Sequence, residues 1–294
     1  EASEKLAKGM HIMLRQGSQA QDLEALAPLV SAQTKHRCML VSDDCHPEDL
    51  LEHGHMNRVL RRAMELSVDP ISAIQLASLN PARYFDLRTL GAIAPGYQAD
   101  ILLLDSLEPL EVSRVYKRGA LVAEGGKCLL AKSSAVAEEK LVSMNLKELT
   151  EEDLRIQIEG SEVRAIRAAP NTLLTDEEIL PVLEKGGEAV SDPERDLLKM
   201  VVIERHRGSG RKGFGFVRGF GLRQGALAST VAHDSHNLIV VGVSDSDMVV
   251  AANVLRELGG GLVVVNNREV EAQLPLPVAG LMSTAPLEQV VAWK

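Results

Sequence analysis

The sequence predicts an α/β fold that leads into a small β unit and then into a second domain of mixed α and β structure. Three observations support this prediction. Residues 1–80 alternate short apolar runs with segments of helical periodicity, which is typical of the units of a parallel α/β structure. Residues 91–96 are rich in turn-forming glycine and proline, and apolar runs of strand length follow them. Beyond residue 149, similar runs alternate with two segments of helical character.

The first 80 residues supply the elements of the α/β part. Residues 11–15 and 38–42 are predicted strands, because each is a short apolar run that ends at small or polar residues. Apolar residues three and four positions apart predict helices, and Pro47 suits the first turn of one of them. We expect these helices at residues 3–10, 21–32, 47–51, 56–66 and 70–79.

The sequence changes character after Asn80-Pro81. A buried strand is expected at residues 99–105, and Arg118-Gly119 should join the strands 112–117 and 120–123 in a hairpin. Residues 131–148 are charged and rich in alanine and serine, which predicts a linker or a surface helix. In the last domain we expect helices at 176–185 and 246–258, the second ended by Gly259-Gly260-Gly261, and strands at 154–158, 162–167, 199–205, 214–220, 238–243 and 262–266.

Composition restricts the class of protein. The net charge of -9 provides no excess of positive charge to neutralise phosphates, which argues against a nucleic-acid partner. No apolar run approaches the roughly 18 residues of a membrane span, so no membrane partner is expected. The three cysteines Cys38, Cys45 and Cys128 form no CxxC pair, which indicates reduced thiols and a cytoplasmic protein. The chain opens at Glu1 in a helix-like segment without an initiator methionine, so we expect it to be a piece of a longer polypeptide.

Asp43 and Asp44 carry the sharpest chemical signal. They follow the predicted strand 38–42, and α/β barrels place catalytic groups at the C-terminal tips of their strands. Just past a strand tip, one carboxylate can reach a metal ion or a nucleophilic water while the other holds substrate. His46 is the histidine closest to them and is a candidate for contact with substrate or water. The alternative is a structural role, in which an acid caps the helix that begins near Pro47.

The motif His53-Gly54-His55 has the HxH spacing of a barrel metal site, in which alternate residues share one face of a strand. It follows a predicted helix, however, and Gly54 would end that helix. A polar loop is therefore the preferred interpretation of this motif.

Residues 208–213 match the pattern GxGxxG, and a predicted strand precedes them. Dinucleotide binding would require a helix directly after the pattern. Residues 214–220 instead alternate as a strand does, so we expect a hairpin loop. The surrounding segment 205–223 is basic and contains no acid; it could contact an anion or an acidic partner, although a solvated hairpin is the default interpretation.

His233, Asp234 and His236 form an additional polar site ahead of the predicted strand 238–243. Two histidines three residues apart with an intervening aspartate could bind a divalent ion. A turn at the entry to the strand, in which the polar side chains satisfy the local backbone, explains the same pattern.

Several longer motifs resemble the amidohydrolase superfamily and, within it, the adenine deaminase family. Residues 76–101 resemble the segment that leads from the metal-binding barrel of amidohydrolases into a flanking β-sandwich. Residues 41–51, with the sequence VSDDCHPEDLL, narrow the resemblance to adenine deaminases. Further matching motifs extend over nearly the whole chain, at residues 9–18, 231–237, 259–265 and 274–282.

The resemblance implies four segments. These are the C-terminal part of a metal-dependent (β/α)8 barrel at residues 1–85, a β-sandwich segment at 86–130, a linker at 131–148 and an α+β C-terminal domain at 149–294. An eight-stranded barrel needs about 200 residues or more. The first part of the barrel, with the other metal ligands of the family, is therefore expected upstream of Glu1.

The resemblance also implies an enzyme of purine salvage that hydrolyses adenine to hypoxanthine and ammonia. A water activated by a divalent metal, Mn or Fe with Zn as an alternative, would attack the ring carbon that bears the amine. Asp43 would correspond to the invariant aspartate that contacts the metal and transfers the proton. Asp44, His46, Arg15 and Ser18 would line the substrate site.

Two alternatives to this function stay open. The chain could be a catalytically inactive fragment that serves assembly or regulation, or it could belong to another amidohydrolase that acts on cyclic amides. If the chain is part of an enzyme, we expect it to work as a homo-oligomer or together with the missing barrel portion. Metal content and a substrate panel of purines and cyclic amides separate these hypotheses.

Overall fold

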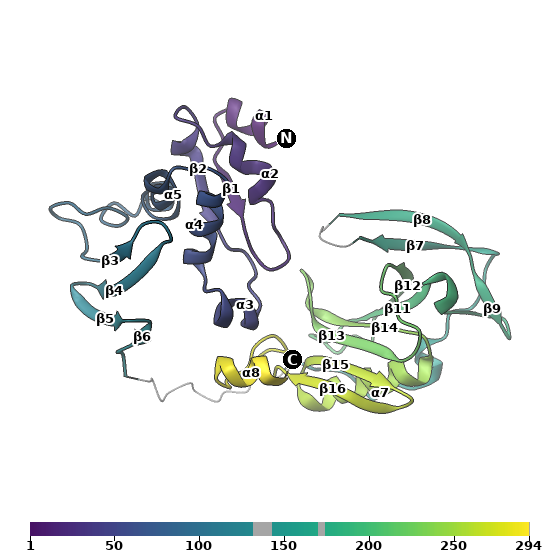
Figure 1. Cartoon of the computed structure of the whole chain (residues 1–294). Coiled ribbons are helices and arrows are strands. Elements are labelled where there is room, and N and C mark those ends of the chain that lie inside the picture. Colours follow the sequence, from purple (N-terminus) through teal and green to yellow (C-terminus); the bar gives the residue numbers. More distant parts are fainter. Residues whose placement is uncertain (132–142, 170–173, 294) are drawn as a thin grey trace. The chain divides into compact units, whose positions relative to one another are not determined.

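The computed structural model describes residues 1–131, 143–169 and 174–293. They form two compact units, Glu1–Ala135 (unit 1) and Val136–Lys294 (unit 2), and each has its own hydrophobic core (Figure 1). The boundary falls inside residues 131–148, which the sequence predicts to be a linker or a surface helix. Residues 132–142 of that segment lie outside the described residues, and residues 143–148 are in neither helix nor strand.

Unit 1 combines parallel strands with short helices, as the sequence predicts. The strands are β1 (Ile12–Arg15) and β2 (Cys38–Val41), which pair in parallel. The helices are α1 (Ala2–Ala7), α2 (Leu23–Leu26), α3 (Pro47–Glu52), α4 (Met56–Glu65), α5 (Pro70–Ala77) and α6 (Leu79–Tyr84). The helix expected at residues 21–32 is shorter, because Pro28 lacks an N–H donor and the chain continues as a 3-10 turn at Ala27–Leu29.

The core of unit 1 places apolar side chains of both strands against the helices. Leu14 of β1 pairs with Leu40 of β2, and both side chains are buried. Val59 of α4 and Leu76 of α5 are fully buried in the same cluster. The buried Asn80 ties α6 to the start of β2, since its amide donates to the carbonyl oxygens of residues 35 and 38 at 2.7 and 2.8 Å. These contacts fix where β2 begins and therefore where its C-terminal tip lies.

A four-stranded antiparallel sheet completes unit 1. Its strands are β3 (Ile101–Ser106), β4 (Glu111–Lys117), β5 (Ala120–Glu124) and β6 (Lys127–Cys128), in that order. Arg118 and Gly119 connect β4 and β5 with φ angles of 51° and 81°, the left-handed conformations of a tight hairpin turn. The predicted β unit and its hairpin are therefore confirmed. The expectation that its first strand is buried is wrong, because Leu102 and Leu103 of β3 are exposed.

Unit 2 is built on an eight-stranded sheet in the order β16-β15-β13-β14-β11-β12-β7-β8. Its neighbouring strands are antiparallel except for β7 and β12, which are parallel. The strands are β7 (Glu162–Ala168), β8 (Thr175–Pro181), β11 (Leu198–Ile203), β12 (Lys212–Arg218), β13 (Ala226–Ala232), β14 (Asn237–Gly242), β15 (Gly261–Asn266) and β16 (Glu269–Pro275). A short hairpin, β9 (Leu183–Lys185) and β10 (Glu188–Val190), lies outside this sheet.

The predicted helix at residues 246–258 is confirmed as α7 (Asp245–Leu258). The hydroxyl of Ser244 accepts a hydrogen bond from the backbone N–H of Asp247 at its start, and Gly259 ends it in the left-handed conformation. Met248 and Leu255 are fully buried against β13, β14 and β15. A second helix, α8 (Leu287–Trp293), packs against β16 near the end of the chain.

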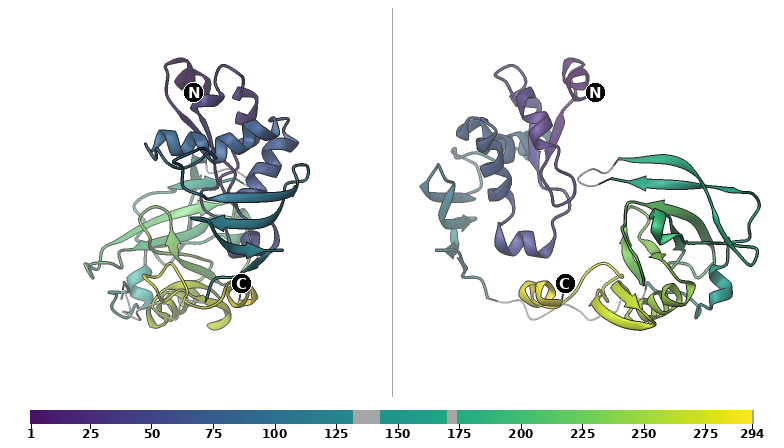
Figure 2. Two further views of the ribbon diagram at one scale, coloured as in Figure 1. Left: turned by 90° about the vertical axis from the view of Figure 1, so that its left-hand side faces the viewer. Right: turned by 45° about the vertical axis from the view of Figure 1, so that its right-hand side comes forward.

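Two predicted elements of unit 2 are wrong. Residues 176–185 are strands and not a helix: β8 pairs with β7, and the two form a long ribbon at one edge of the sheet (Figure 2, right). Charged side chains on β8, such as Asp176 and Glu177, form ion pairs with arginines of β7, which only the folded sheet brings opposite them. Residues 154–158 do not form a full strand. Leu154 ends the 3-10 turn Glu151–Leu154, and the residues after it make only an isolated antiparallel bridge, between Gln157 and Glu188. The strands β10, β13 and β16 and the helix α8 lie outside the predicted elements.

Among the described residues, no helix combines the length and the apolar character needed to cross a lipid bilayer.

Candidate active site

The predicted site residues of unit 1 follow the C-terminal ends of β1 and β2. Arg15, the last residue of β1, is in register with Val41, the last residue of β2. Because the strands are parallel, the segments that follow them emerge at the same edge. The N–H of Ser18 donates to the carbonyl oxygen of Asp44 at 2.9 Å, which joins the two segments directly. The structure therefore brings Arg15, Ser18, Asp43 and Asp44 together.

Asp43 is held by an arginine. Its backbone has a φ of 59°, in the left-handed region, and its Oδ1 accepts a hydrogen bond from the N–H of Asp44 at 2.8 Å. Arg15 Nη1 donates to Asp43 Oδ2 at 3.1 Å. Arg15 also donates twice to Asp22 Oδ2, at 2.9 and 2.6 Å, and this hydrogen bonding to Asp22 is the main cause that raises the pKa of Arg15. The guanidinium therefore stays charged, and it places a positive charge beside the carboxylate of Asp43.

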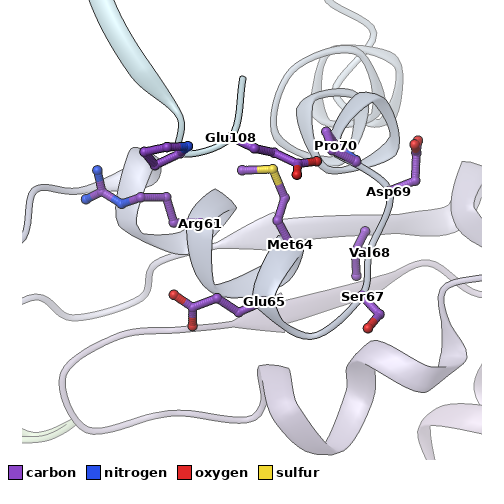
Figure 3. A pocket seen from close by; sticks show the side chains of 9 residues that line it. Arg61, Met64, Glu65, Ser67, Val68, Asp69, Pro70 and Glu108 are labelled. Atoms are coloured by element: carbon purple, nitrogen blue, oxygen red, sulfur yellow. The ribbon is translucent and has the colours of Figure 1, made fainter. Parts of the chain in front are cut away.

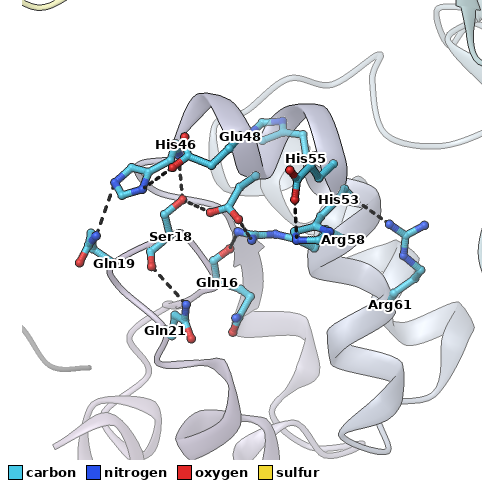
Figure 4. Close-up of polar contacts among 12 residues, drawn as sticks. Gln16, Ser18, Gln19, Gln21, His46, Glu48, His53, His55, Arg58 and Arg61 are labelled. Atoms are coloured by element: carbon cyan, nitrogen blue, oxygen red, sulfur yellow. Dashed lines mark hydrogen bonds and ion pairs between the residues drawn. The ribbon is translucent and has the colours of Figure 1, made fainter. Parts of the chain in front are cut away.

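Ser18 and His46 meet at the start of α3 (Figure 4). The Ser18 hydroxyl accepts a hydrogen bond from the N–H of His46 at 2.8 Å and donates to Asp49 Oδ2. Nε2 of the His46 ring lies 3.5 Å from Nε2 of Gln19. Hydrogen bonding by Ser18 lowers the pKa of Asp49 despite partial burial, and the positive charge of Arg58 acts in the same direction.

Gly17 lets these two segments approach each other. A Cβ atom at this position would lie 2.5 Å from the carbonyl oxygen of Ser42 and 2.7 Å from that of Asp44. Both are backbone atoms, which cannot rotate away as the end of a side chain can. Gly17 stands out only in the folded chain, because the packing of two segments 25 residues or more apart makes a glycine necessary there.

The Gly17→Ala substitution should therefore destabilise unit 1. Overpacking of this kind costs about 1–3 kcal/mol. Urea denaturation of the chain followed by circular dichroism measures the change in free energy of unfolding. Gly160→Ala is the matched control, since a Cβ there meets open space and the backbone φ is ordinary; equal stability of the two variants would contradict the clash.

His55 joins the same edge of the sheet, although it was interpreted as part of a polar loop. Its Nε2 lies 2.9 Å from the hydroxyl of Ser42, the residue after β2. Gly54, with a φ of 87°, reverses the chain between α3 and α4 and makes this contact possible. The HxH spacing is typical of metal ligands and does not predict a hydrogen bond between His55 and Ser42.

These residues do not form a complete metal site. Among residues 1–131, 143–169 and 174–293, no group of three or more His, Cys, Asp or Glu side chains is arranged to hold a metal ion. Catalytic metal sites take at least three protein ligands. Asp43 by itself therefore does not suffice to hold the divalent metal that the family resemblance implies.

A hollow of unit 1 lies away from these residues. It measures about 460 Å³ and is lined by the end of α4, the turn into α5 and the residues before β4, which include Arg61, Met64, Asp69 and Glu108 (Figure 3). None of the predicted site residues lines it.

The additional polar site lies in unit 2, at the turn between β13 and β14. The rings of His233 and His236 have centroids 5.2 Å apart, and Nδ1 of His233 contacts the carboxylate of Asp234. His206 reaches the same turn, since its Nε2 lies 3.1 Å from the carbonyl oxygen of Ser235. The structure therefore brings the three predicted residues together and adds His206, which the sequence analysis did not name.

The glycine-rich segment 208–213 forms a hairpin, as predicted: residues 208–211 lie in the loop between β11 and β12, and Lys212 and Gly213 begin β12. Glu204 anchors the loop by accepting hydrogen bonds from the Ser209 hydroxyl and from three backbone N–H groups, which lower its pKa to about 2. Much of the basic character of segment 205–223 is neutralised locally: Lys212 pairs with Asp153, and Arg218 pairs with Glu178. This pairing favours a structural hairpin over a surface for anions.

Two family models match the chain. The amidohydrolase family model matches residues 2–122, and the model of the adenine deaminase C-terminal domain matches residues 172–293. The adenine deaminase of Desulfatibacillum aliphaticivorans is 47% identical over 99% of this chain and 51% of its own length. That of Dehalococcoides mccartyi (strain ATCC BAA-2266 / KCTC 15142 / 195) is 45% identical over the same shares. The chain is homologous to the adenine deaminases.

This homology confirms the resemblance seen in the sequence. The amidohydrolase match over residues 2–122 also agrees with the α/β structure of unit 1. The chain spans about half the length of the adenine deaminases that it matches. Among solved structures, an amidohydrolase from Thermotoga maritima MSB8 covers 41% of this chain and 45% of its own, with 16% identity and a TM-score of 0.24, which is too low to support a conclusion about the fold.

Proposed function

We propose that this chain forms part of an adenine deaminase that hydrolyses adenine to hypoxanthine and ammonia. Relatives named adenine deaminase match 99% of the chain. The observation that carries the proposal is the convergence of Arg15, Ser18, Asp43 and Asp44 where β1 and β2 end. In the overall reaction, water supplies the oxygen of hypoxanthine and the exocyclic nitrogen leaves as ammonia.

In this proposal Asp43 is the catalytic residue. A carboxylate can take a proton from the attacking water and deliver it to the leaving amine. Arg15 orients the carboxylate of Asp43 by donating a hydrogen bond to its Oδ2 at 3.1 Å. Asp44, His46, Arg15 and Ser18 contact the purine substrate.

A divalent metal, Mn or Fe with Zn as an alternative, is part of the same proposal. Asp43 would contribute one carboxylate ligand. Because the described residues do not complete a ligand set, the remaining ligands would come from other parts of the protein. Support for this comes from the relatives, which are about twice as long as the chain.

We further propose the following architecture for the complete protein. Residues 1–85 are the C-terminal part of a (β/α)8 barrel, residues 86–130 belong to a β-sandwich, 131–148 are a linker, and 149–294 are an α+β domain. The parallel pairing of β1 and β2 and the amidohydrolase match support the barrel. The protein would act in purine salvage in the cytoplasm, as a homo-oligomer or with the missing barrel portion, and His233, Asp234 and His236 would form an additional polar site.

Metal analysis and a substrate panel test this function. The protein to test is a longer polypeptide that includes this sequence and is as long as its relatives. It should contain stoichiometric Mn, Fe or Zn and release ammonia from adenine. Removal of the metal by a chelator should stop the reaction, and added Mn should restore it. A metal-free and inactive protein would favour an assembly or regulatory module, and hydrolysis of cyclic amides in place of adenine would favour another amidohydrolase.

A further inference from the structure

Two charged side chains outside the predicted site connect its segments. Asp49 lies on α3 and Arg58 lies on α4, and both side chains are largely buried, with exposed fractions of 23% and 19%. Asp49 Oδ1 lies 3.4 Å from Arg58 Nη1. Arg58 Nη2 donates to the carbonyl oxygen of Gln16 at 3.3 Å (Figure 4). The pair therefore links two helices to the segment that follows β1.

Asp49 also determines how the Ser18 hydroxyl can bond. An ionised carboxylate only accepts hydrogen bonds, and a serine hydroxyl has a single proton to donate. Hydrogen bonding by Ser18 lowers the pKa of Asp49, and the positive charge of Arg58 also favours its ionised form. The proton of Ser18 is therefore directed at Asp49.

The Ser18 oxygen can still accept a hydrogen bond. One of the two lone pairs of its oxygen accepts the N–H of His46 at 2.8 Å, which leaves one lone pair. A group that binds to this oxygen must then bring an N–H or O–H donor. Adenine has such donors in its exocyclic amine and in its imidazole N–H, whereas its other ring nitrogens are acceptors.

We propose that Asp49 is a positioning residue that, supported by Arg58, holds Ser18 as a hydrogen-bond acceptor for an N–H group of the purine. This assignment rests on the proposed function. It makes Asp49 a determinant of specificity that acts through Ser18. Purines that replace the recognised N–H with N-methyl should bind more weakly for this reason.

Asp49→Ala in the full-length protein tests the assignment, because it frees the Ser18 proton. We expect the KM for adenine to rise about tenfold with a much smaller change in kcat. N6,N6-dimethyladenine lacks the N–H donors of the amine, and 9-methyladenine lacks the imidazole N–H. The preference of the protein for adenine over whichever of these two purines it discriminates against should fall by a similar factor. Glu52→Ala is the matched control, since Glu52 is an exposed carboxylate on the same helix whose ion-pair partner is the neighbouring His53, and it should change neither quantity.

Hydrogen exchange of the backbone amides of Ser18 and His46 in the Asp49→Ala variant shows whether the segments that follow β1 and β2 loosen. A reduced preference with unchanged exchange at these positions supports the assignment, because the segments then keep their structure while the hydrogen bonding of Ser18 changes. Faster exchange with an unchanged KM and an unchanged preference would overturn it and leave Asp49 with a structural role only. An unsubstituted protein that does not deaminate adenine would instead overturn the proposed function, and the assignment with it.

Discussion

The Asp43→Asn substitution should lower kcat for adenine by about 10³-fold or more while unit 1 stays folded. The amide cannot take up the proton that the proposed reaction requires, and positioned acids and bases contribute about 10²–10⁴-fold to rates. The fold should persist because asparagine, like aspartate, tolerates the left-handed backbone of this position, where φ is 59°. Steady-state kinetics of the full-length protein and its melting temperature measure the two effects.

Asp86→Asn is the matched control for this substitution. Asp86 also has a left-handed backbone, with a φ of 54°, and it also pairs with an arginine, Arg88, at 2.9 Å. It is exposed and lies outside the candidate site. Its replacement should leave kcat unchanged, and a kcat for Asp43→Asn within tenfold of the unsubstituted protein would rule out the catalytic role of Asp43.

The Arg205→Met substitution should destabilise unit 2 by about 3 kcal/mol or more. The Arg205 side chain is fully buried, and burial lowers its pKa. Its guanidinium donates to the carbonyl oxygens of four separate segments, those of Ser143, Thr230, His236 and Ala279. Methionine fills similar space but donates nothing, and each buried acceptor that is left unsatisfied costs about 1–3 kcal/mol.

Urea denaturation followed by the fluorescence of Trp293 measures this loss, because the single tryptophan of the chain belongs to unit 2. Arg207→Met is the control, since Arg207 lies two residues further along the chain and is exposed. A loss below 1 kcal/mol for Arg205→Met would mean that the carbonyl groups find other partners. The same substitution should also loosen the turn that carries His236, whose carbonyl oxygen Arg205 Nε contacts at 2.6 Å.

Local patterns predicted the buried strands and the long helix well. The alternation along β15 and the spacing of apolar residues in α7 each reflect one buried face. The continuous apolar runs of β2 and β14 contain consecutive buried residues, which indicates that both faces of these strands are covered. The strand β8 was mistaken for a helix because its apolar positions, among them Ile179, are compatible with helical spacing. Its pairing with β7, which places Glu177 beside Arg164, lies outside what a local window can encode.

The sequence by itself determined the α/β class, the hairpin at the glycine-rich segment, the homology to adenine deaminases and the candidate residues that follow β1 and β2. Only the tertiary structure decided which groups these residues contact. Asp43 pairs with Arg15 from 28 positions away, and Ser18 pairs with Asp49 from 31 positions away. The physical reason is that hydrogen-bond partners are selected by distance and direction in the folded chain, whereas spacing along the sequence reports only which face of an element is buried.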